Sequence, residues 1–165
     1  LRIMDKINTI RQLVDDFDTT SQLYQDLNQT TSYYGTDTLL TPAEIQTIAA
    51  IDYHPKVNLT QLAELRKVTK GTATKSVQKL VKKGMTSKQF LAGSENIIEL
   101  TLTNKGQIAA NNHKTYVRQM EEQLFDIYSD ISEQTTSDLV KINNRTVTFF
   151  KKMIAERERE TIRDR

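Results

Sequence analysis

Apolar residues recur at steps of three and four along the first part of the chain, which is the spacing of one face of an α-helix. This stripe consists of Ile3, Ile7, Ile10, Val14 and Phe17, and then of Tyr24 and Leu27. The segment TSYYGTDTLL interrupts it, with Gly35 as the strongest breaker. A stripe of this length on a first helix needs a partner surface. The pattern therefore predicts a long N-terminal helix that packs against something else.

The next stretch predicts two short helices. Thr41-Pro42-Ala43-Glu44 has the form of a capping box with proline in the first turn, and His54-Pro55 ends that helix. Either Asn58 or Thr60 then caps a second helix, which ends at a turn formed by Lys67 and Val68. The expected buried faces of the two helices are Ile45, Ile48, Ala49 and Ile51, and Leu59, Leu62, Ala63 and Leu65.

A third helix follows, with Thr69 as its cap and Gly84 after its end. At 100° per residue, its apolar residues fall on one side and predict a core face made of Ala73, Val77, Leu80 and Val81. The opposite side holds Lys, Thr, Gln and Gly and no acid. Gly71 weakens the helix, and it would allow the backbone to approach either DNA or a neighbouring helix.

Alternating residues after Gly84 predict two strands, Met85–Leu91 and Ile97–Thr103, with a hairpin tip at 92–96. Two long helices complete the chain. The first carries Ile108, Tyr116, Met120, Leu124, Ile127 and Ile131, and the second carries Leu139, Ile142, Thr146, Phe149 and Met153. Cap residues lie between them at 132–138. A hairpin directly after an amphipathic third helix is typical of a winged helix-turn-helix.

Composition narrows the function classes. The chain has 165 residues, enough for a core without metals or disulfides, and no cysteine, which excludes disulfides, thiol switches and Cys-ligated zinc. No apolar run reaches the roughly 20 residues that cross a membrane. The N-terminal LRIMDKIN lacks the apolar region of a signal peptide. We therefore expect a cytoplasmic protein with no membrane partner.

Charge is distributed unevenly, although the net charge is only +2. No Asp or Glu occurs between Arg66 and Lys88, so the basic residues of this interval are expected to be uncompensated. They are Arg66, Lys67, Lys70, Lys75, Lys79, Lys82, Lys83 and Lys88. A local patch of this kind attracts phosphate backbones, although a solvated lysine-rich helix face has the same composition.

Other candidate chemistry is sparse. His54 and His113 are the two histidines, and without cysteine they make a poor ligand set, so we expect no metal site and no cofactor. No Ser-His-Asp arrangement or glycine-rich phosphate loop is present, so we expect no catalytic residue. The aromatic rings either line an apolar pocket or pack at a junction between parts of the chain, and these are Tyr33, Tyr34, Tyr53 and Tyr116.

The chain resembles the MarR family of bacterial transcription regulators along nearly its whole length. The resemblance is carried by LTPAEIQTIAAI, by NLTQLAELRKVTKGTATKSVQKLVKKG and by IIELTLTNKG. It implies a mainly α fold with a small β-hairpin, in which a winged helix-turn-helix lobe (37–103) lies between dimerisation helices (1–36 and 104–165) of one MarR-like domain. The family forms homodimers on pseudo-palindromic operators. Many members release DNA when a small molecule, a metal or an oxidant acts near the junction of the two regions, and a small-molecule effector is the form open to this chain.

The resemblance also assigns site residues. Those expected to contact double-stranded DNA are Thr69, Lys70, Gly71, Thr72, Thr74, Lys75, Gln78, Lys79, Lys88, Ser94 and Asn96. Those expected to form the homodimer are Ile3, Ile7, Ile10, Val14, Leu139, Ile142, Phe149 and Met153. The wing departs from the family, because Ser94, Glu95 and Asn96 stand where an Asp-x-Arg motif is usual.

The resulting interpretation is a homodimeric DNA-binding regulator that acts as a repressor. The alternative is a winged-helix module that binds protein, which Glu95 and the missing wing arginine favour. Salt-dependent binding to DNA discriminates between the two.

Overall fold

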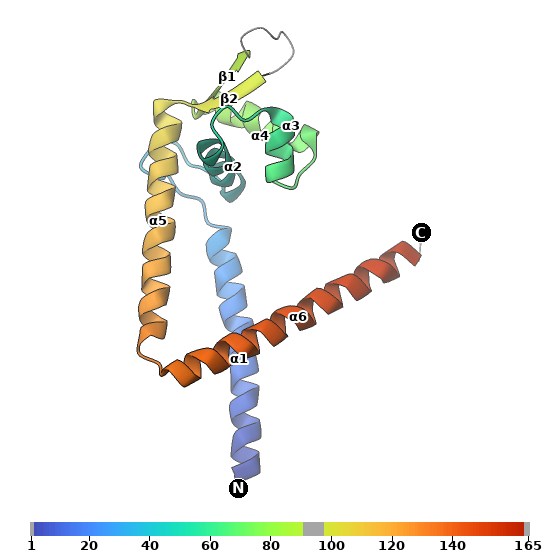
Figure 1. Cartoon of the computed structure of the whole chain (residues 1–165). Coiled ribbons are helices and arrows are strands. Elements are labelled where there is room, and N and C mark those ends of the chain that lie inside the picture. The colour runs from blue at the N-terminus through green and yellow to red at the C-terminus, as the bar shows by residue number, and fades with distance from the viewer. Residues whose placement is uncertain (1, 91–97, 164–165) are drawn as a thin grey trace. The chain divides into compact units, whose positions relative to one another are not determined.

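The computed structural model describes residues 2–90 and 98–163, and it confirms a mainly α fold with one β-hairpin (Figure 1). The chain divides into two compact units, Leu1–Val117 and Arg118–Arg165. The elements in order are α1 (Arg2–Asn28), α2 (Pro42–Tyr53), α3 (Leu59–Leu65), α4 (Lys70–Lys82), β1 (Thr86–Phe90), β2 (Ile98–Leu102), α5 (Asn104–Ser129) and α6 (Glu133–Arg163). Among the helices of the described residues, none combines the length and apolarity that a membrane crossing requires.

The caps of α2 and α3 follow from local sequence. Thr41 accepts from the amide of Glu44 at 3.3 Å, and the carboxylate of Glu44 accepts from the amide of Thr41 at 2.8 Å, which is the expected capping box. Asn58, rather than Thr60, caps α3 and forms a second capping box with Gln61. His54 is the C-cap of α2, as the following proline predicts.

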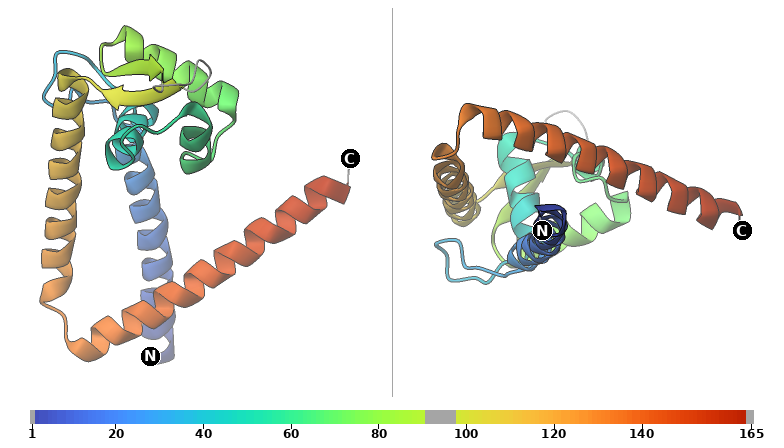
Figure 2. Two further views of the ribbon diagram at one scale, coloured as in Figure 1. Left: turned by 45° about the horizontal axis from the view of Figure 1, so that its top comes forward. Right: turned by 90° about the horizontal axis from the view of Figure 1, so that it is seen from below.

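The β-hairpin is antiparallel, with Thr86 opposite Leu102 and Phe90 opposite Ile98. Its second strand also bonds to the segment before α3, because the amide of Leu100 donates to the carbonyl of Val57 at 2.9 Å. Figure 1 and the left view of Figure 2 show α4 beside this hairpin. The hairpin and α2–α4 therefore form one packed body, and we call the described residues of 37–103 the winged-helix lobe.

Two neighbouring clusters form the core of the lobe. One joins α2, α4 and the residue before β1 to the first turns of α5, and its buried members are Leu40, Ile45, Ile48, Leu80, Met85, Ala109 and Ala110. The other joins α2, α3, α4 and β2 through Ile51, Val57, Leu62, Val77 and Leu100. Burying these side chains supplies most of the driving force for folding the lobe, at about 1.5–3 kcal/mol for each large one.

Three details of the expected core faces are wrong. Val81 and Leu65 are 40% and 45% exposed, and Ala49 is half-buried while Thr47 is buried. Val81 and Leu65 lie near the C-terminal ends of short helices, where the lobe no longer covers them. Helical periodicity places a residue on a face, but the reach of the neighbouring elements decides whether that face is covered.

The LTNKG segment joins β2 to α5 through a close backbone approach. Thr103 donates to the carbonyl of Gly84 at 2.6 Å and accepts from the amide of Gly106 at 3.1 Å, so it ties the end of α4 to the start of α5. A Cβ atom on Gly106 would lie 1.9 Å from the carbonyl oxygen of Met85. Only glycine fits there without a backbone shift, which explains this residue in the motif.

The long helices expose most of their apolar residues. On α1, Ile3 and Val14 are 77% and 61% exposed. The second unit consists of the end of α5 and α6, and Ser132 caps α6 by accepting from the amide of Thr135 at 3.2 Å. Ile131 lies after the end of α5 rather than on it, which corrects the expected stripe. The apolar residues of these long helices therefore recur with the spacing of a packed helix face, but most of them remain exposed.

Candidate nucleic-acid interface

Helix α4 is amphipathic in the way the sequence predicts. Thr69 is its N-cap and accepts from the amide of Thr72 at 3.2 Å, while the two threonine hydroxyls lie 2.9 Å apart. Ala73, Val77 and Leu80 face the core. The cap holds the first turn of the helix at the surface, so the free amides and the positive end of the helix dipole are open to an anion.

The opposite face of α4 is a continuous exposed polar surface. It consists of Lys70, Gly71, Thr72, Lys75, Gln78 and Lys79. Thr74 differs from the other candidates because it is half-buried and its hydroxyl donates to the carbonyl of Lys70 at 2.8 Å. The structure therefore gathers the α4 candidates on one surface, with Thr74 at the margin.

Gly71 lies on this surface with open space above it. The nearest side-chain or backbone atom to a Cβ placed there is the Thr69 hydroxyl, at 3.9 Å. No neighbouring helix of the described chain approaches Gly71, so its small size is not required by packing. Of the two uses that the sequence leaves open, close approach of an external molecule is the one compatible with this geometry.

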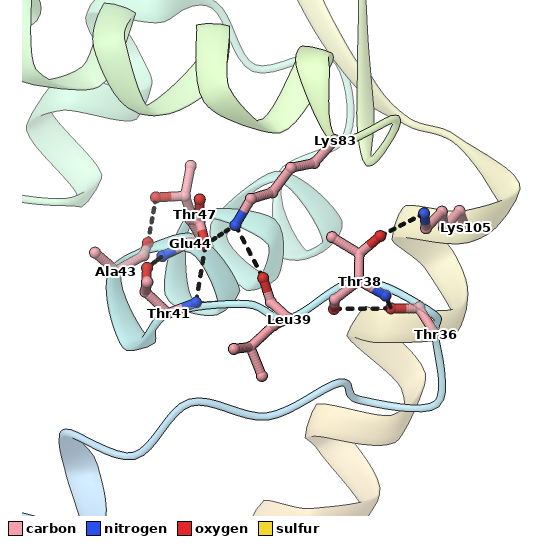
Figure 3. A network of polar contacts seen from close by, with 9 residues as sticks. All are labelled: Thr36, Thr38, Leu39, Thr41, Ala43, Glu44, Thr47, Lys83 and Lys105. Carbon is pink, nitrogen blue, oxygen red and sulfur yellow. Dashed lines mark hydrogen bonds and ion pairs between the residues drawn. The ribbon is translucent and has the colours of Figure 1, made fainter.

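The basic interval from Arg66 to Lys88 is less uniform than its sequence. Lys83 turns away from the polar face of α4 and forms an ion pair with Glu44 at 2.7 Å, so the expectation that all these charges are uncompensated is wrong (Figure 3). Burial lowers the pKa of Arg66, which is half-buried. The exposed remainder forms no ion pair within the described residues and consists of Lys67, Lys70, Lys75, Lys79, Lys82 and Lys88.

The Lys83–Glu44 contact holds the end of α4 against the start of α2. Figure 3 shows Lys83 reaching both the Glu44 carboxylate and the carbonyl of Leu39, at 2.9 Å. Burial by itself raises the pKa of Glu44, but hydrogen bonds from Lys83 and Thr41 and the charge of Lys83 bring it below its usual value. The Glu44 side chain is 8% exposed, so its loss of Lys83 would leave a desolvated charge with fewer hydrogen bonds, and the pair therefore resists displacement. The pair therefore fixes α4 within the lobe.

The wing is described at its base. Lys88 is exposed on β1, opposite the buried Leu100. Ser94 and Asn96, together with Glu95, lie outside the described residues, so their expected contacts stay predictions. Lys88 adds an exposed positive charge on the hairpin to those on α4.

Tyr34 and Tyr53 both contact residues of α5, at His113 and at Lys114 respectively. Tyr34 packs edge-on against His113 with ring centroids 5.7 Å apart, and Tyr53 lies under the ammonium of Lys114 at 5.0 Å. Burial lowers the pKa of His113 and raises that of Tyr34. A cavity of about 750 Å³ borders Tyr53, His54 and Leu65, but the other three tyrosines do not line it. No group of three or more His, Asp or Glu suited to a metal is present among the described residues.

Sequence reasoning missed the polar contacts that attach the lobe to α5. Asp52 near the end of α2 pairs with Lys114, and its other oxygen accepts from Gln107 at 2.8 Å. Lys105 pairs with Asp37 at 2.5 Å and donates to Thr38 at 2.6 Å. The partners are 62 and 68 positions apart in sequence for the two ion pairs (114 − 52 and 105 − 37), so no local pattern could signal them.

Comparison with known proteins supports the resemblance to MarR regulators. Residues 40–86 match the model of the MarR family, and no curated protein matches the chain. The fold is similar to that of Streptococcus pneumoniae FabT, solved in complex with DNA, with 23% identity, a TM-score of 0.63 and coverage of 88% of this chain and 98% of that one.

Two further structures have the same fold. The zinc-responsive MarR family member Lactococcus lactis ZitR has 12% identity and a TM-score of 0.71, over 86% of this chain and 99% of its own. Staphylococcus aureus MarR, in complex with salicylate and kanamycin, has 16% identity and a TM-score of 0.54, over 86% and 92%. These matches confirm the MarR-like winged-helix fold.

Proposed function

We propose that this chain, whose winged helix is that of the MarR family, is a sequence-specific DNA-binding transcription regulator that acts as a homodimeric repressor. The observation that carries the proposal is the exposed face of α4, which holds Lys70, Lys75, Gln78 and Lys79 and no acid. A helix with this face on the surface of a winged-helix lobe fits a major groove. A protein with this function works in the cytoplasm, where the DNA is.

The residues on α4 suit different parts of a duplex. Thr69, Lys70 and Thr72 surround the helix N-terminus, where amides and the helix dipole favour a phosphate. One hydroxyl of the Thr69–Thr72 pair donates to the other, which leaves a hydrogen free to donate to an external acceptor. Lys75 and Gln78 lie one and two turns further on and are assigned to base edges, where an amide or ammonium discriminates between base pairs.

Homodimerisation is supported by the exposed apolar stripes. Ile7 and Ile10 of α1 are 44% and 49% exposed, and Ile142 and Phe149 of α6 are 54% and 55% exposed. Stripes of this length are unusual on the surface of a monomer and are typical of helices that pack against another copy. Two lobes in one dimer would engage the two half-sites of a pseudo-palindromic operator. A small-molecule effector that releases the DNA completes the proposal, since the S. aureus relative was solved with salicylate.

The test is selection of random duplex DNA by the wild-type chain, followed by footprinting on the recovered sequence. Binding should weaken steeply with salt, and Lys70→Ala, which removes a lysine assigned to a phosphate, should lower the salt slope by about 0.9 while weakening binding. Lys141→Ala, which removes a lysine from α6 that pairs with Asp138, is the matched control and should leave the slope unchanged. A wild-type chain that recovers no sequence at low salt would instead support the protein-interaction alternative.

A further inference from the structure

The lobe meets α5 in two places: at Gly106, which lies against the Met85 carbonyl, and at a small apolar patch about one turn further along the helix. The patch is formed by Ala109 and Ala110, which pack in one cluster with Leu40 and Ile48. Alanine side chains interdigitate poorly with their neighbours, because a single methyl group projects only a short distance from the helix. Such a patch opposes separation of the lobe from α5 but resists rotation of one on the other only weakly.

Two polar contacts flank this patch along α5. Lys105 pairs with Asp37 on one side, and Lys114 pairs with Asp52 on the other. The two lysines are nine residues apart on the helix, which corresponds to about 13.5 Å. Ion pairs on both sides of the alanine patch oppose rotation of the lobe about it. The pair that is less exposed to water contributes more.

The two pairs differ in strength. The Asp37 side chain is 83% exposed, so water competes strongly for it. The Asp52 side chain is 9% exposed and is held at both oxygens, by Lys114 and by Gln107, whose amide also donates to Asn111 at 3.1 Å. Burial by itself raises the pKa of Asp52, but the ion pair with Lys114 and the hydrogen bond from Gln107 lower it below its usual value. Asp52 is therefore charged and tightly held.

The position of Asp52 is unfavourable within its own helix. It is the penultimate residue of α2, where the exposed carbonyls of the helix end disfavour a negative charge, and the last turn of α2 holds no basic residue. Among the described residues, the groups that stabilise the Asp52 charge are Lys114 and Gln107, and both lie on α5. The rest of the path to α4 is rigid, because α2 and α4 share both core clusters and are joined by the Glu44–Lys83 pair.

We propose that Asp52, held by Lys114 and Gln107, is a positioning residue that fixes the orientation of the winged-helix lobe on α5 and so sets the half-site spacing at which two lobes engage DNA. The part of this inference that concerns spacing rests on the proposed function above. The part that concerns orientation is a property of the single chain. Asp52 itself touches α5 and not the polar face of α4, so it acts on recognition through geometry alone.

The orientation is measured with spin labels. The chain has no native cysteine, so Thr60→Cys in α3 and Thr115→Cys in α5 report one lobe-to-α5 distance when the labelled chain is diluted into unlabelled chain. Both sites are exposed. In this background, Asp52→Asn should broaden or displace the distance distribution. Glu122→Gln is the control, because it removes a charge from a pair within α5 itself, and it should leave the distribution unchanged.

The spacing is measured with the selected operator and with versions that carry one or two base pairs inserted at its centre. Each inserted base pair rotates one half-site by about 34–36° relative to the other. Asp52→Asn should bind the native spacing about tenfold more weakly, within the range usual for coupling between sites. It should also lose less affinity on the inserted duplexes than the wild type does. Lys114→Arg keeps the charge and should retain the wild-type spacing preference.

Thermal unfolding first establishes that each variant is folded. If Asp52→Asn is not folded, Lys114→Gln, which removes the same ion pair, replaces it in both measurements. An unchanged distance distribution together with an unchanged ratio of affinities across the spacings would overturn the inference. An equal loss of affinity on every operator spacing would also overturn the spacing claim, because a variant that is simply less able to bind DNA gives that result. If the wild-type chain selects no duplex, the proposed function fails and the spacing claim fails with it, while an altered distribution would still support the orientation claim.

Discussion

Similar apolar residues are buried in the winged-helix lobe and exposed on the long helices. In the lobe, Ile48, Leu62 and Leu80 are fully buried by contacts within one chain. On α1 and α6, Ile3 is 77% exposed and Phe149 is 55% exposed. Both regions have the periodicity of packed helices, so the difference lies in what covers the apolar face. The lobe covers its apolar faces within one chain, whereas the long helices leave theirs exposed.

The largest expected effect comes from breaking the long-helix face. Ile142→Glu places a charge in the proposed interface and should convert a dimer into a monomer at micromolar concentration. Because the two half-sites would then be bound independently, affinity for the operator should fall by about 10²–10⁴-fold. Sedimentation velocity and DNA binding measure these changes. A variant that remains dimeric would contradict the interface, and an unchanged melting temperature of the lobe is the control.

Breaking the lobe from inside should have the next largest effect. Gly106→Ala places a methyl group 1.9 Å from the Met85 carbonyl and should lower the free energy of unfolding by about 3 kcal/mol. Thermal and chemical denaturation measure it. Little loss of stability would mean that α5 and β1 can separate without cost, which would weaken the description of the lobe as a closed body.

Gly71→Ala is the matched change on the open face of α4. No atom lies within 3.4 Å of the new methyl group, so the substitution should raise the free energy of unfolding by roughly 0.5–1 kcal/mol through helix propensity. Affinity for the selected operator should nevertheless fall about fivefold, equivalent to roughly 1 kcal/mol, if the backbone approaches DNA at Gly71. Stabilisation without loss of binding would remove Gly71 from the contact surface.

The smallest expected effect concerns pH at the contact between Tyr34 and His113. Burial lowers the pKa of His113 below its usual 6.5, so the folded state binds this proton less readily than the unfolded state does. Well above pH 6.5 His113 is neutral in both states and has no effect on the free energy of unfolding. As the pH falls from 6.5 towards the lower pKa of the folded state, the free energy of unfolding decreases by at most about 1.4 kcal/mol per pH unit. His113→Phe keeps a ring against Tyr34 and should remove this slope from denaturation curves measured across that window.

Local sequence determined much of the lobe. The capping box at Thr41, the cap at Thr69 and the end of α2 at His54 follow from residues within four positions of one another, whereas local sequence narrows the cap of α3 only to Asn58 or Thr60. The acid-free polar face of α4 follows from helical periodicity in the same way. These features need no information from the rest of the chain, because capping and amphipathicity arise within one or two helical turns.

Tertiary structure decided which of those residues are available. It withdrew Lys83 from the basic face by pairing it with Glu44, left Val81 exposed, and brought Asp52 to Lys114 across 62 positions of sequence. It also explains why residue 106 is glycine, because the Met85 carbonyl lies where a side chain would be. Periodicity specifies direction around a helix axis, but burial and ion pairing depend on which distant elements stand opposite, and that is set only when the core closes.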